Sequence, residues 1–445
     1  MTNQYTLWHD HSRLIVLAVP MILANITTPL LGLVDTAVLG HMQSPSMLAG
    51  ASIGALILTQ IYWVCGFLRM STTGLSAQAR GRVEDRDAAA RVLWQTVGIA
   101  IVISVLLLIL QVPILRIGIG LADPSTQVEQ WLGQYYQVRV WGAPAALVNI
   151  AMIGWLVGQQ RTRLVMIIQI TGNLLNGALD VGLVYGLGWG VEGVALASVF
   201  AEYTMATMAL IGGLCQIGWR LPSTAWFNDA ARRVLLKLNS DMLIRNLALQ
   251  GCLAFLTLQG ARLGETHAAV NAILMQFFVL IALGLDGIAH AVEALVGEAS
   301  GAQNQRAIVQ RTHQGLVWSS FFALAYTLVF WMFGTDIIQL LTQHNEIITE
   351  ALTYLPLMVI LPLLAHWCFL YDGVFVGLTR ASSMRNSMVF SALIVFFPVW
   401  FVTQSFGNVA LWYALLAFLV ARGATLAIAF AMLNRRNQLV SVAEQ

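Results

Sequence analysis

One carboxylate stands alone in a long apolar stretch near the start of the chain. The segment GLVDTAVLGH contains Asp35, the only ionisable residue between Leu14 and Leu39. A carboxylate at the centre of an apolar helix costs about 2.5–3.5 kcal/mol on insertion scales, so such residues face a protein interior or a wet cavity and commonly serve a function. Asp35 could bind and release a proton, or hold a cation through its oxygens. The structural alternative is that Asp35 caps a packed pair of helices.

A second polar group follows in the segment ITGNLLNGALD. Asn173, Asn176 and Asp180 are spaced i, i+3 and i+7, which places them on one face of a helix. Asp180 has a predicted depth similar to that of Asp35. Two carboxylates with an amide nearby could share one proton or hold a sodium ion. The alternative for Asp180 is that it ends its helix among lipid headgroups.

The second half of the chain has ionisable residues of its own within apolar segments: Asp286, His290, Glu293, His366 and Asp372. Asp286 and Glu293 are seven residues apart and share a helical face. They could line a cleft that attracts a cationic substrate, together with Asn173 and Asp372, or they could pair with Arg245 or Arg69 of other segments. No further ligands occur at a spacing suited to a zinc-type site, so we expect no bound metal apart from a coupling ion.

Two prolines interrupt the segment that carries Asp35. An interior proline removes one backbone hydrogen bond and permits a bend. Pro20 is therefore a candidate hinge through which a change of charge becomes movement, or it is a static kink. The chain has no phosphate-binding glycine loop and no catalytic triad spacing, so we expect neither an enzyme nor an organic cofactor. Uphill transport would then draw on a gradient of H+ or Na+.

The elements that position these residues are predicted from composition. The 445 residues are 58% hydrophobic and only 10% charged, with a mean hydropathy of +0.75, whereas soluble proteins contain about 25% charged residues. A membrane-spanning helix needs about 20 mainly apolar residues. Twelve such segments are predicted near 13–40, 46–70, 91–115, 128–157, 164–186, 190–217, 238–261, 268–298, 313–334, 348–377, 386–404 and 408–433.

The arginines predict the orientation of these spans. Of the 23 Lys and Arg residues, 17 fall in the tails and even-numbered loops, and only Arg116 and Arg262 fall in odd-numbered loops. Cytoplasmic loops carry the excess of Lys and Arg, so both termini are expected in the cytoplasm. The polar N-terminus and the long first apolar run do not resemble a cleavable signal peptide.

The chain also contains an internal repeat. At an offset of 220, Leu75, Ala79, Gly81, Arg86 and Arg91 match Leu295, Ala299, Gly301, Arg306 and Arg311. At an offset of 219, Tyr135, Gly154, Val157, Gly158 and Arg161 match Tyr354, Gly373, Val376, Gly377 and Arg380. An offset of six spans preserves direction, which indicates a parallel repeat of the kind found in carriers. We expect an N-terminal lobe at 1–217, a cytoplasmic linker at 218–237 and a C-terminal lobe at 238–445.

These features resemble a known family. Twelve spans in two parallel halves, PLLGLVDTAVLGH in the first span, TGLSAQARG after the second and GNLLNGALD in the fifth are similar to the MATE (multidrug and toxic compound extrusion) transporters. The segments RNSM and GLDGIAHAVEALVGEASGAQN are most similar to the DinF branch. The resemblance covers essentially the whole chain.

The resemblance implies export of hydrophobic, commonly cationic compounds in exchange for protons or sodium, with protons favoured here. It implies coupling at Asp35, Asn176 and Asp180, with Ser198 near a hydroxyl position of the same site. It further implies a bacterial inner membrane location, small-molecule substrates, no nucleic-acid partner and a monomer.

Three other functions compete with this interpretation. A flippase for lipid-linked precursors, within the same superfamily, would need a strongly cationic cleft to bind pyrophosphate. A membrane-embedded enzyme would need clustered metal ligands or a nucleophile motif. A channel would not support concentrative, gradient-driven flux.

Overall fold

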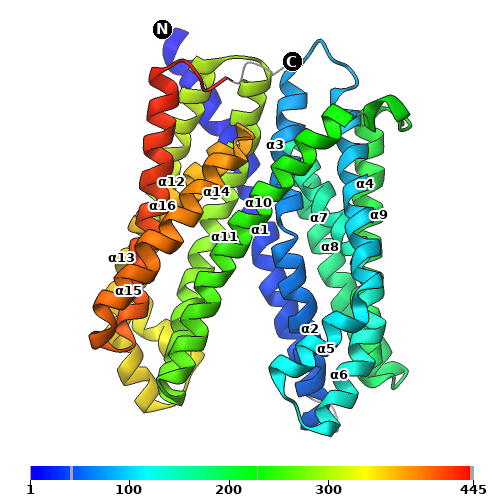
Figure 1. The fold of residues 1–445 in the computed structure, drawn as a ribbon, viewed down its shortest axis with the longest axis vertical. Helices are drawn as coiled ribbons and strands as arrows, with labels where there is room; N and C mark the ends of the chain where they lie inside the picture. The colour runs from blue at the N-terminus through cyan, green and yellow to red at the C-terminus, as the bar shows by residue number, and fades with distance from the viewer. Residues whose placement is uncertain (1, 41–43, 228, 441–445) are drawn as a thin grey trace. The chain divides into compact units, whose positions relative to one another are not determined.

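The computed structural model describes residues 2–40, 44–227 and 229–440, without the side chains of residues 2–10, 28, 30–36 and 229–232. Over this part the chain is helical and has no strands (Figure 1). The first half contains α1 (Thr2–Gly40), α2 (Pro45–Val64), α3 (Phe67–Gly81), α4 (Ala88–Ile109), α5 (Gln111–Ala122), α6 (Thr126–Arg139), η1 (Val140–Gly142), α7 (Ala143–Gly158), α8 (Thr162–Val181), η2 (Gly182–Gly186) and α9 (Gly190–Ile217). The short η3 (Thr224–Phe227) leads to the second half, which contains α10 (Asp229–Arg262), α11 (Glu265–Gly301), α12 (Gln305–Leu341), α13 (Asn345–Gly377), α14 (Ala381–Phe390), η4 (Ser391–Phe396), α15 (Phe397–Thr403), η5 (Gln404–Phe406) and α16 (Val409–Arg435).

The predicted all-α membrane architecture is confirmed. Eleven helical segments of the described residues are long and apolar enough to cross a bilayer, and α1 contains the first predicted span, with an apolar stretch at His11–Thr27. Helices prevail because the bilayer core offers no water to the backbone, and a helix satisfies its N–H and C=O groups internally.

Several spans consist of more than one helix, which the apolar pattern does not predict. The fourth span joins α6 and α7 through the 3₁₀ turn η1, and Pro144 stands in the first turn of α7. The fifth span ends in the π-helical turn η2 after Asp180. Proline removes a backbone donor, and 3₁₀ and π turns inside helices commonly mark functional places.

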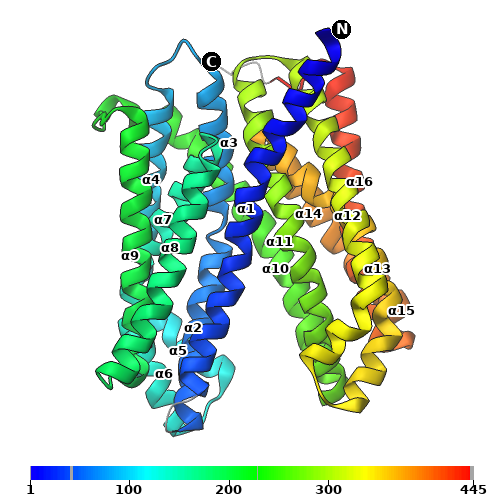
Figure 2. The ribbon, with the colours of Figure 1, turned by 180° about the vertical axis from the view of Figure 1, so that it is seen from behind.

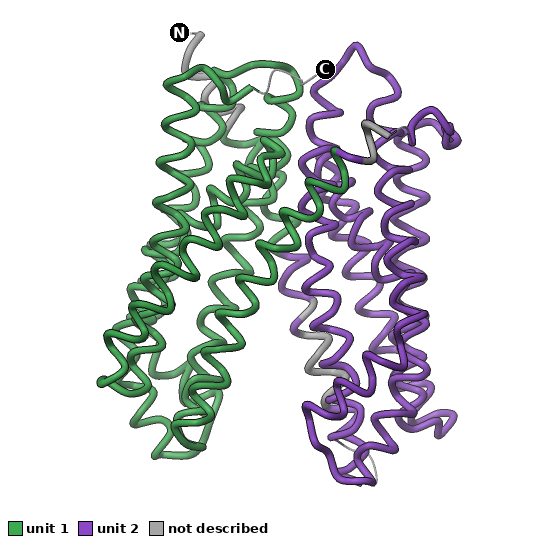
Figure 3. The backbone as a smooth tube through the Cα atoms, viewed as in Figure 1, with its two compact units in different colours: residues 1–22, 234–445 green, residues 23–233 purple. Residues whose placement is uncertain are grey.

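The chain divides into two compact units (Figure 3). Unit 1 comprises residues 1–22 and 234–445, and unit 2 comprises residues 23–233. Helix α1 therefore begins in unit 1 and continues into unit 2 after Ile22. Figure 2 shows its first part along α11 and α12 of unit 1, where Arg13 Nη2 donates to Glu298 Oε2 at 2.6 Å.

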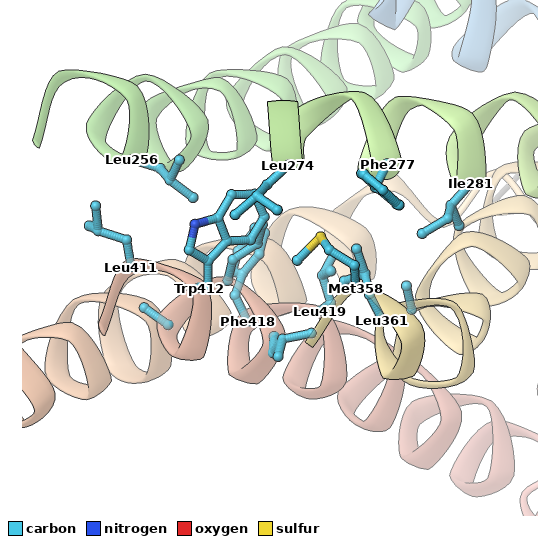
Figure 4. Close-up of a cluster of buried hydrophobic side chains, with 14 of the residues drawn as sticks. Leu256, Leu274, Phe277, Ile281, Met358, Leu361, Leu411, Trp412, Phe418 and Leu419 are labelled. Carbon is cyan, nitrogen blue, oxygen red and sulfur yellow. The ribbon is translucent and has the colours of Figure 1, made fainter. Parts of the chain in front are cut away.

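Unit 1 contains a large apolar core between α10, α11, α13 and α16 (Figure 4). Its largest fully buried side chains include Phe277 of α11 and Trp412 of α16. Unit 2 contains smaller clusters, one of which joins Val38 and Leu39 of α1 to Tyr135 of α6 and Val191 of α9. These cores hold the helices that carry the polar residues described below.

The internal repeat recurs in the packing of each unit. Helix α7 crosses α3 at Gly154, where a Cβ atom would lie 2.4 Å from the Arg69 carbonyl oxygen. Helix α13 crosses α11 at Gly373, where a Cβ atom would lie 2.7 Å from the Ala289 carbonyl oxygen. The first offset of the repeat relates Arg69 to Ala289, and the second relates the two glycines. Small residues permit such close approach of membrane helices.

Candidate functional site

One stripe of α8 is buried in unit 2 and changes from apolar to polar along the helix. It contains Val165, Ile168, Gly172, Asn176 and Asp180. Asn176 Nδ2 donates to Asp180 Oδ2 at 2.7 Å, and the two residues are only 3% and 0% exposed. Asn176 and Asp180, which the spacing places on one face of the helix, thus form a buried hydrogen-bonded pair.

Asn173 lies on the neighbouring part of the same helix and is half-buried. Its Nδ2 donates to the hydroxyl of Thr27 in α1 at 2.9 Å. The hydrogen bond joins α8 to the helix that carries Asp35. The side chain of Asp35 lies outside the described residues, although its backbone is part of α1. Thr27 is a contact that the sequence did not single out, because one hydroxyl in an apolar helix is a weak signal.

Ser198 of α9 is buried in unit 2. The register between α8 and α9 follows from two close contacts, because a Cβ atom on Gly172 would meet Met205 and one on Gly193 would meet Leu183. The helices are antiparallel, so Asp180 lies level with Ala197, next to Ser198. The structure thus places Ser198 at the depth of the Asn176–Asp180 pair.

Pro20 is buried in unit 1, two residues before α1 passes into unit 2. Helix α1 continues without interruption through Pro20 and Pro29. The candidate hinge therefore stands close to the point where one helix changes its structural unit.

In the second half, Asp372 of α13 lies within a buried ion cluster. Its Oδ2 accepts hydrogen bonds from Arg245 of α10 and Arg422 of α16, each at 2.5 Å. All three residues are less than a tenth exposed. The sequence offered Arg245 as a partner of the acids on α11, whereas the structure pairs it with Asp372. The pairing of Arg245 with Asp372 depends on which helices meet at a given depth, and the sequence pattern does not encode this.

The three ionisable residues of α11 that the sequence singled out differ in burial. Asp286 is half-buried and close enough to Arg422 to act on it electrostatically. His290 and Glu293 are buried. The backbone carbonyl oxygen of Glu293 lies against Gly377 of α13.

A further ion pair in unit 2 received no role from the sequence. Arg139, the last residue of α6, binds Glu202 of α9 with both ends of its guanidinium. The Nη1–Oε2 and Nη2–Oε1 distances are 2.7 and 2.5 Å. The sequence could have indicated this pair, because Arg139 and Glu202 are opposite charges near the middle of two predicted spans.

Comparison with known proteins decides the family. The MatE family model matches residues 20–181 and again residues 242–402. The chain belongs to the MatE family. The two matches cover corresponding spans of the first and second halves in the same order, which confirms the predicted parallel repeat. The chain is thus a multi-pass membrane transporter of the MATE type.

Individual relatives agree with this assignment. This MATE protein is 42% identical to DNA damage-inducible protein F of Escherichia coli over 432 residues, which are 96% of this chain and 92% of the relative. It is 26% identical to the probable multidrug resistance protein NorM of Thermotoga maritima over 353 residues, 75% of this chain and 73% of that one. The predicted similarity to the DinF branch is confirmed.

The fold of this MATE protein also matches solved structures. The Vibrio cholerae MATE transporter VcmN, in an aspartate-to-asparagine variant, has a TM-score of 0.85 at 18% identity, with 98% of this chain and 100% of that chain covered. A crystal structure of MATE in complex with MaD3S has a TM-score of 0.82 at 18% identity, with 96% of each chain covered. These likenesses concern the fold.

Proposed function

We propose that this MATE protein is an ion-coupled antiporter that exports hydrophobic, commonly cationic compounds by alternating access. The coupling ion is H+ in the favoured form of the proposal and Na+ in the other. The names of two relatives, multidrug resistance protein and DETOXIFICATION, support such a substrate class. The candidate coupling residues are Asp35, Asn176, Asp180 and Ser198.

The observation that carries the proposal is the buried Asn176–Asp180 pair. A carboxylate that is 0% exposed inside a membrane protein is strongly affected by a bound cation, because burial penalises its charged form. Binding of a proton or a sodium ion at Asp180 therefore changes the charge of the site. One charge that crosses 100 mV supplies about 2.3 kcal/mol, which is the order of energy that a carrier needs.

The ion cluster of the second half supports coupling in the first. Asp372 forms ion pairs with two guanidinium groups, whose positive charges compensate the carboxylate without a further cation. An acid neutralised in this way is poorly suited to bind and release a coupling ion in each cycle. We therefore place the coupling site in unit 2.

The same arrangement weighs against the flippase alternative. A flippase for lipid-linked precursors needs guanidinium groups available to a pyrophosphate. Arg139 is bound to Glu202, and both Arg245 and Arg422 are bound to Asp372. These buried arginines serve carboxylates of the protein itself.

The test uses proteoliposomes that contain the wild type, Asp35→Asn or Asp180→Asn. A pH gradient or a sodium gradient is imposed separately, and the movement of a fluorescent cationic dye is recorded. Asp123→Asn is the matched control, because Asp123 is exposed in the loop after α5 and has a left-handed backbone that asparagine also accepts.

Dye movement driven by the pH gradient alone, and lost in both site variants but not in Asp123→Asn, is the expected result. Movement that requires a sodium gradient would change the coupling ion. Undiminished movement in both site variants would contradict the site. Cysteine labelling of the termini in intact cells tests the expected inner-membrane topology with both ends in the cytoplasm.

A further inference from the structure

The Arg139–Glu202 ion pair is buried at mid-span in unit 2. The guanidinium and carboxylate side chains are only 13% and 12% exposed. Arg139 is near the middle of the 33-residue span Thr126–Gly158, and Glu202 is near the middle of Gly190–Ile217. Bidentate binding between opposite charges offsets part of the free energy that is needed to bury them. Either charge buried alone would have its full desolvation penalty.

The pair stands at the break of the fourth span. Arg139 is followed by η1, whose last residue, Gly142, lies against the ion pair. A Cβ atom on Gly142 would lie 2.2 Å from Glu202 Oε2 and 2.7 Å from Arg139 Nη1. A second bond nearby joins the same elements, because Tyr203 Oη donates to the Trp141 carbonyl oxygen at 3.1 Å. Helix α9 is therefore fixed to the broken turn.

The pair also lies at the depth of the candidate coupling site. The register of α8 and α9 places Asn176 level with Ala201, the residue before Glu202. Ser198 and Glu202 are four residues apart and both are buried, so they share one face of α9. A displacement of Glu202 would thus move Ser198 relative to Asn176 and Asp180.

The surroundings of the pair contain few other ionisable groups. Glu202, Tyr62 and Tyr135 act electrostatically on Arg139, and its guanidinium carbon lies 5.8 Å from the centre of the Tyr62 ring. On the adjacent α8, the acid nearest in level is Asp180. Arg139 is thus the one cation among the described groups that act on Glu202.

We propose that Arg139 is a positioning residue of the coupling site, which holds Glu202 at the broken turn as a permanently compensated anion. Glu202 then takes up no coupling cation, and the charge of unit 2 changes at the coupling carboxylates alone. The role of Arg139 rests on the proposed function, because it concerns which carboxylates exchange ions during transport.

The test compares Arg139→Gln, the double variant Arg139→Gln/Glu202→Gln and Arg139→Lys. Removal of the guanidinium leaves a buried carboxylate that a proton can neutralise. Purified Arg139→Gln is therefore expected to take up one proton more than the wild type between pH 8 and pH 6, counted with an indicator dye. The double variant and Arg139→Lys are expected to return to the wild-type number.

Transport gives a second readout. Arg139→Gln is expected to export dye about tenfold more slowly than the wild type at pH 8 and to recover at pH 6, because the unpaired charge is then neutralised. The double variant is expected to keep the wild-type pH profile. An Arg139→Gln protein with the wild-type proton count and pH profile would overturn the proposal, as would a double variant no better than the single one.

The proton count requires no transport. Failure of the wild type to export dye under either a pH gradient or a sodium gradient would thus count against the proposed function, while the proton count still judges Arg139. Where Arg139→Gln does not fold, the rates of dye export by Arg139→Lys and Glu202→Gln are compared instead. Only Glu202→Gln leaves an uncompensated buried cation, so only this variant is expected to export dye more slowly than the wild type.

Discussion

Gly158 of α7 lies directly against Ala77 of α3. A Cβ atom on Gly158 would be 2.7 Å from the Ala77 amide nitrogen, and a Cβ atom on Gly377 of α13 would be 2.9 Å from the Gly297 amide nitrogen of α11. Ala77 and Gly297 occupy equivalent positions of the internal repeat. Each repeat therefore contains the same close helix crossing: α3 with α7 in unit 2, and α11 with α13 in unit 1.

Gly158→Ala is expected to destabilise the protein by about 1–3 kcal/mol, because the new methyl group meets backbone atoms that cannot turn away. Thermal unfolding in detergent measures the effect. Gly133→Ala is the control: Gly133 lies within α6, and a Cβ atom there would have nothing within 4 Å. Alanine at this position is expected to stabilise by up to about 1 kcal/mol. Equal melting temperatures for Gly158→Ala and the wild type would contradict the close crossing.

Asp372→Asn is expected to destabilise unit 1 by about 3–5 kcal/mol, because Arg245 and Arg422 lose their shared carboxylate in a buried place. The control is Asp336→Asn, an exposed residue of α12. Thermal unfolding is expected to show a lower melting temperature for Asp372→Asn and an unchanged melting temperature for the control.

A variant that removes all charges of the Asp372 cluster distinguishes a structural role of this cluster from a coupling role. The triple variant Asp372→Leu, Arg245→Met and Arg422→Met is expected to recover most of the stability, since apolar residues of similar volume commonly replace a buried ion cluster without loss. Its export is expected to remain driven by the pH gradient. A folded triple variant without gradient-driven export would assign a coupling role to unit 1.

The ion pair between Arg13 and Glu298 is expected to contribute modestly to the attachment of α1 to unit 1. Its side chains are 34% and 26% exposed, so a double-mutant cycle with alanine should give about 0.5–1 kcal/mol. The pair Arg91–Asp85, with side chains 38% and 37% exposed and a distance of 3.4 Å, is the control. It should give a coupling energy near zero. A larger value for the control would contradict the ranking.

Asn271 and Asn408 form a reciprocal amide pair in unit 1, with distances of 2.7 and 2.9 Å. Trp412 Nε1 also donates to Asn271 Oδ1 at 2.8 Å. Asn271→Leu removes the hydrogen bonds that Asn408 Oδ1 and Trp412 Nε1 now form, and it is expected to lower stability by about 2–4 kcal/mol in thermal unfolding. The double variant Asn271→Leu/Asn408→Leu should be less affected than two independent losses would predict, because it removes both amides together.

Much of the architecture was predictable from the sequence. The apolar segments correspond to the helical spans because, in a bilayer, the length of an apolar run and the need to satisfy the backbone both demand a helix. The two-fold repeat was visible in Gly154 and Gly373, whose neighbours recur at the same offset. The spacing of Asn176 and Asp180 predicted a shared face, and the structure shows their hydrogen bond.

The sequence by itself thus determined the helices and the local pair on α8, which depend on composition and on residues within two helical turns. It also determined the repeat and the family, which depend on residue patterns that recur along the chain. Only the tertiary structure decided that Asp372 binds Arg245 and Arg422, that Arg139 binds Glu202, and that α1 begins in one unit and continues in the other. The physical reason is that these partners lie on different helices. Their meeting depends on the rotation, the depth and the breaks of those helices, which packing sets and hydropathy does not encode.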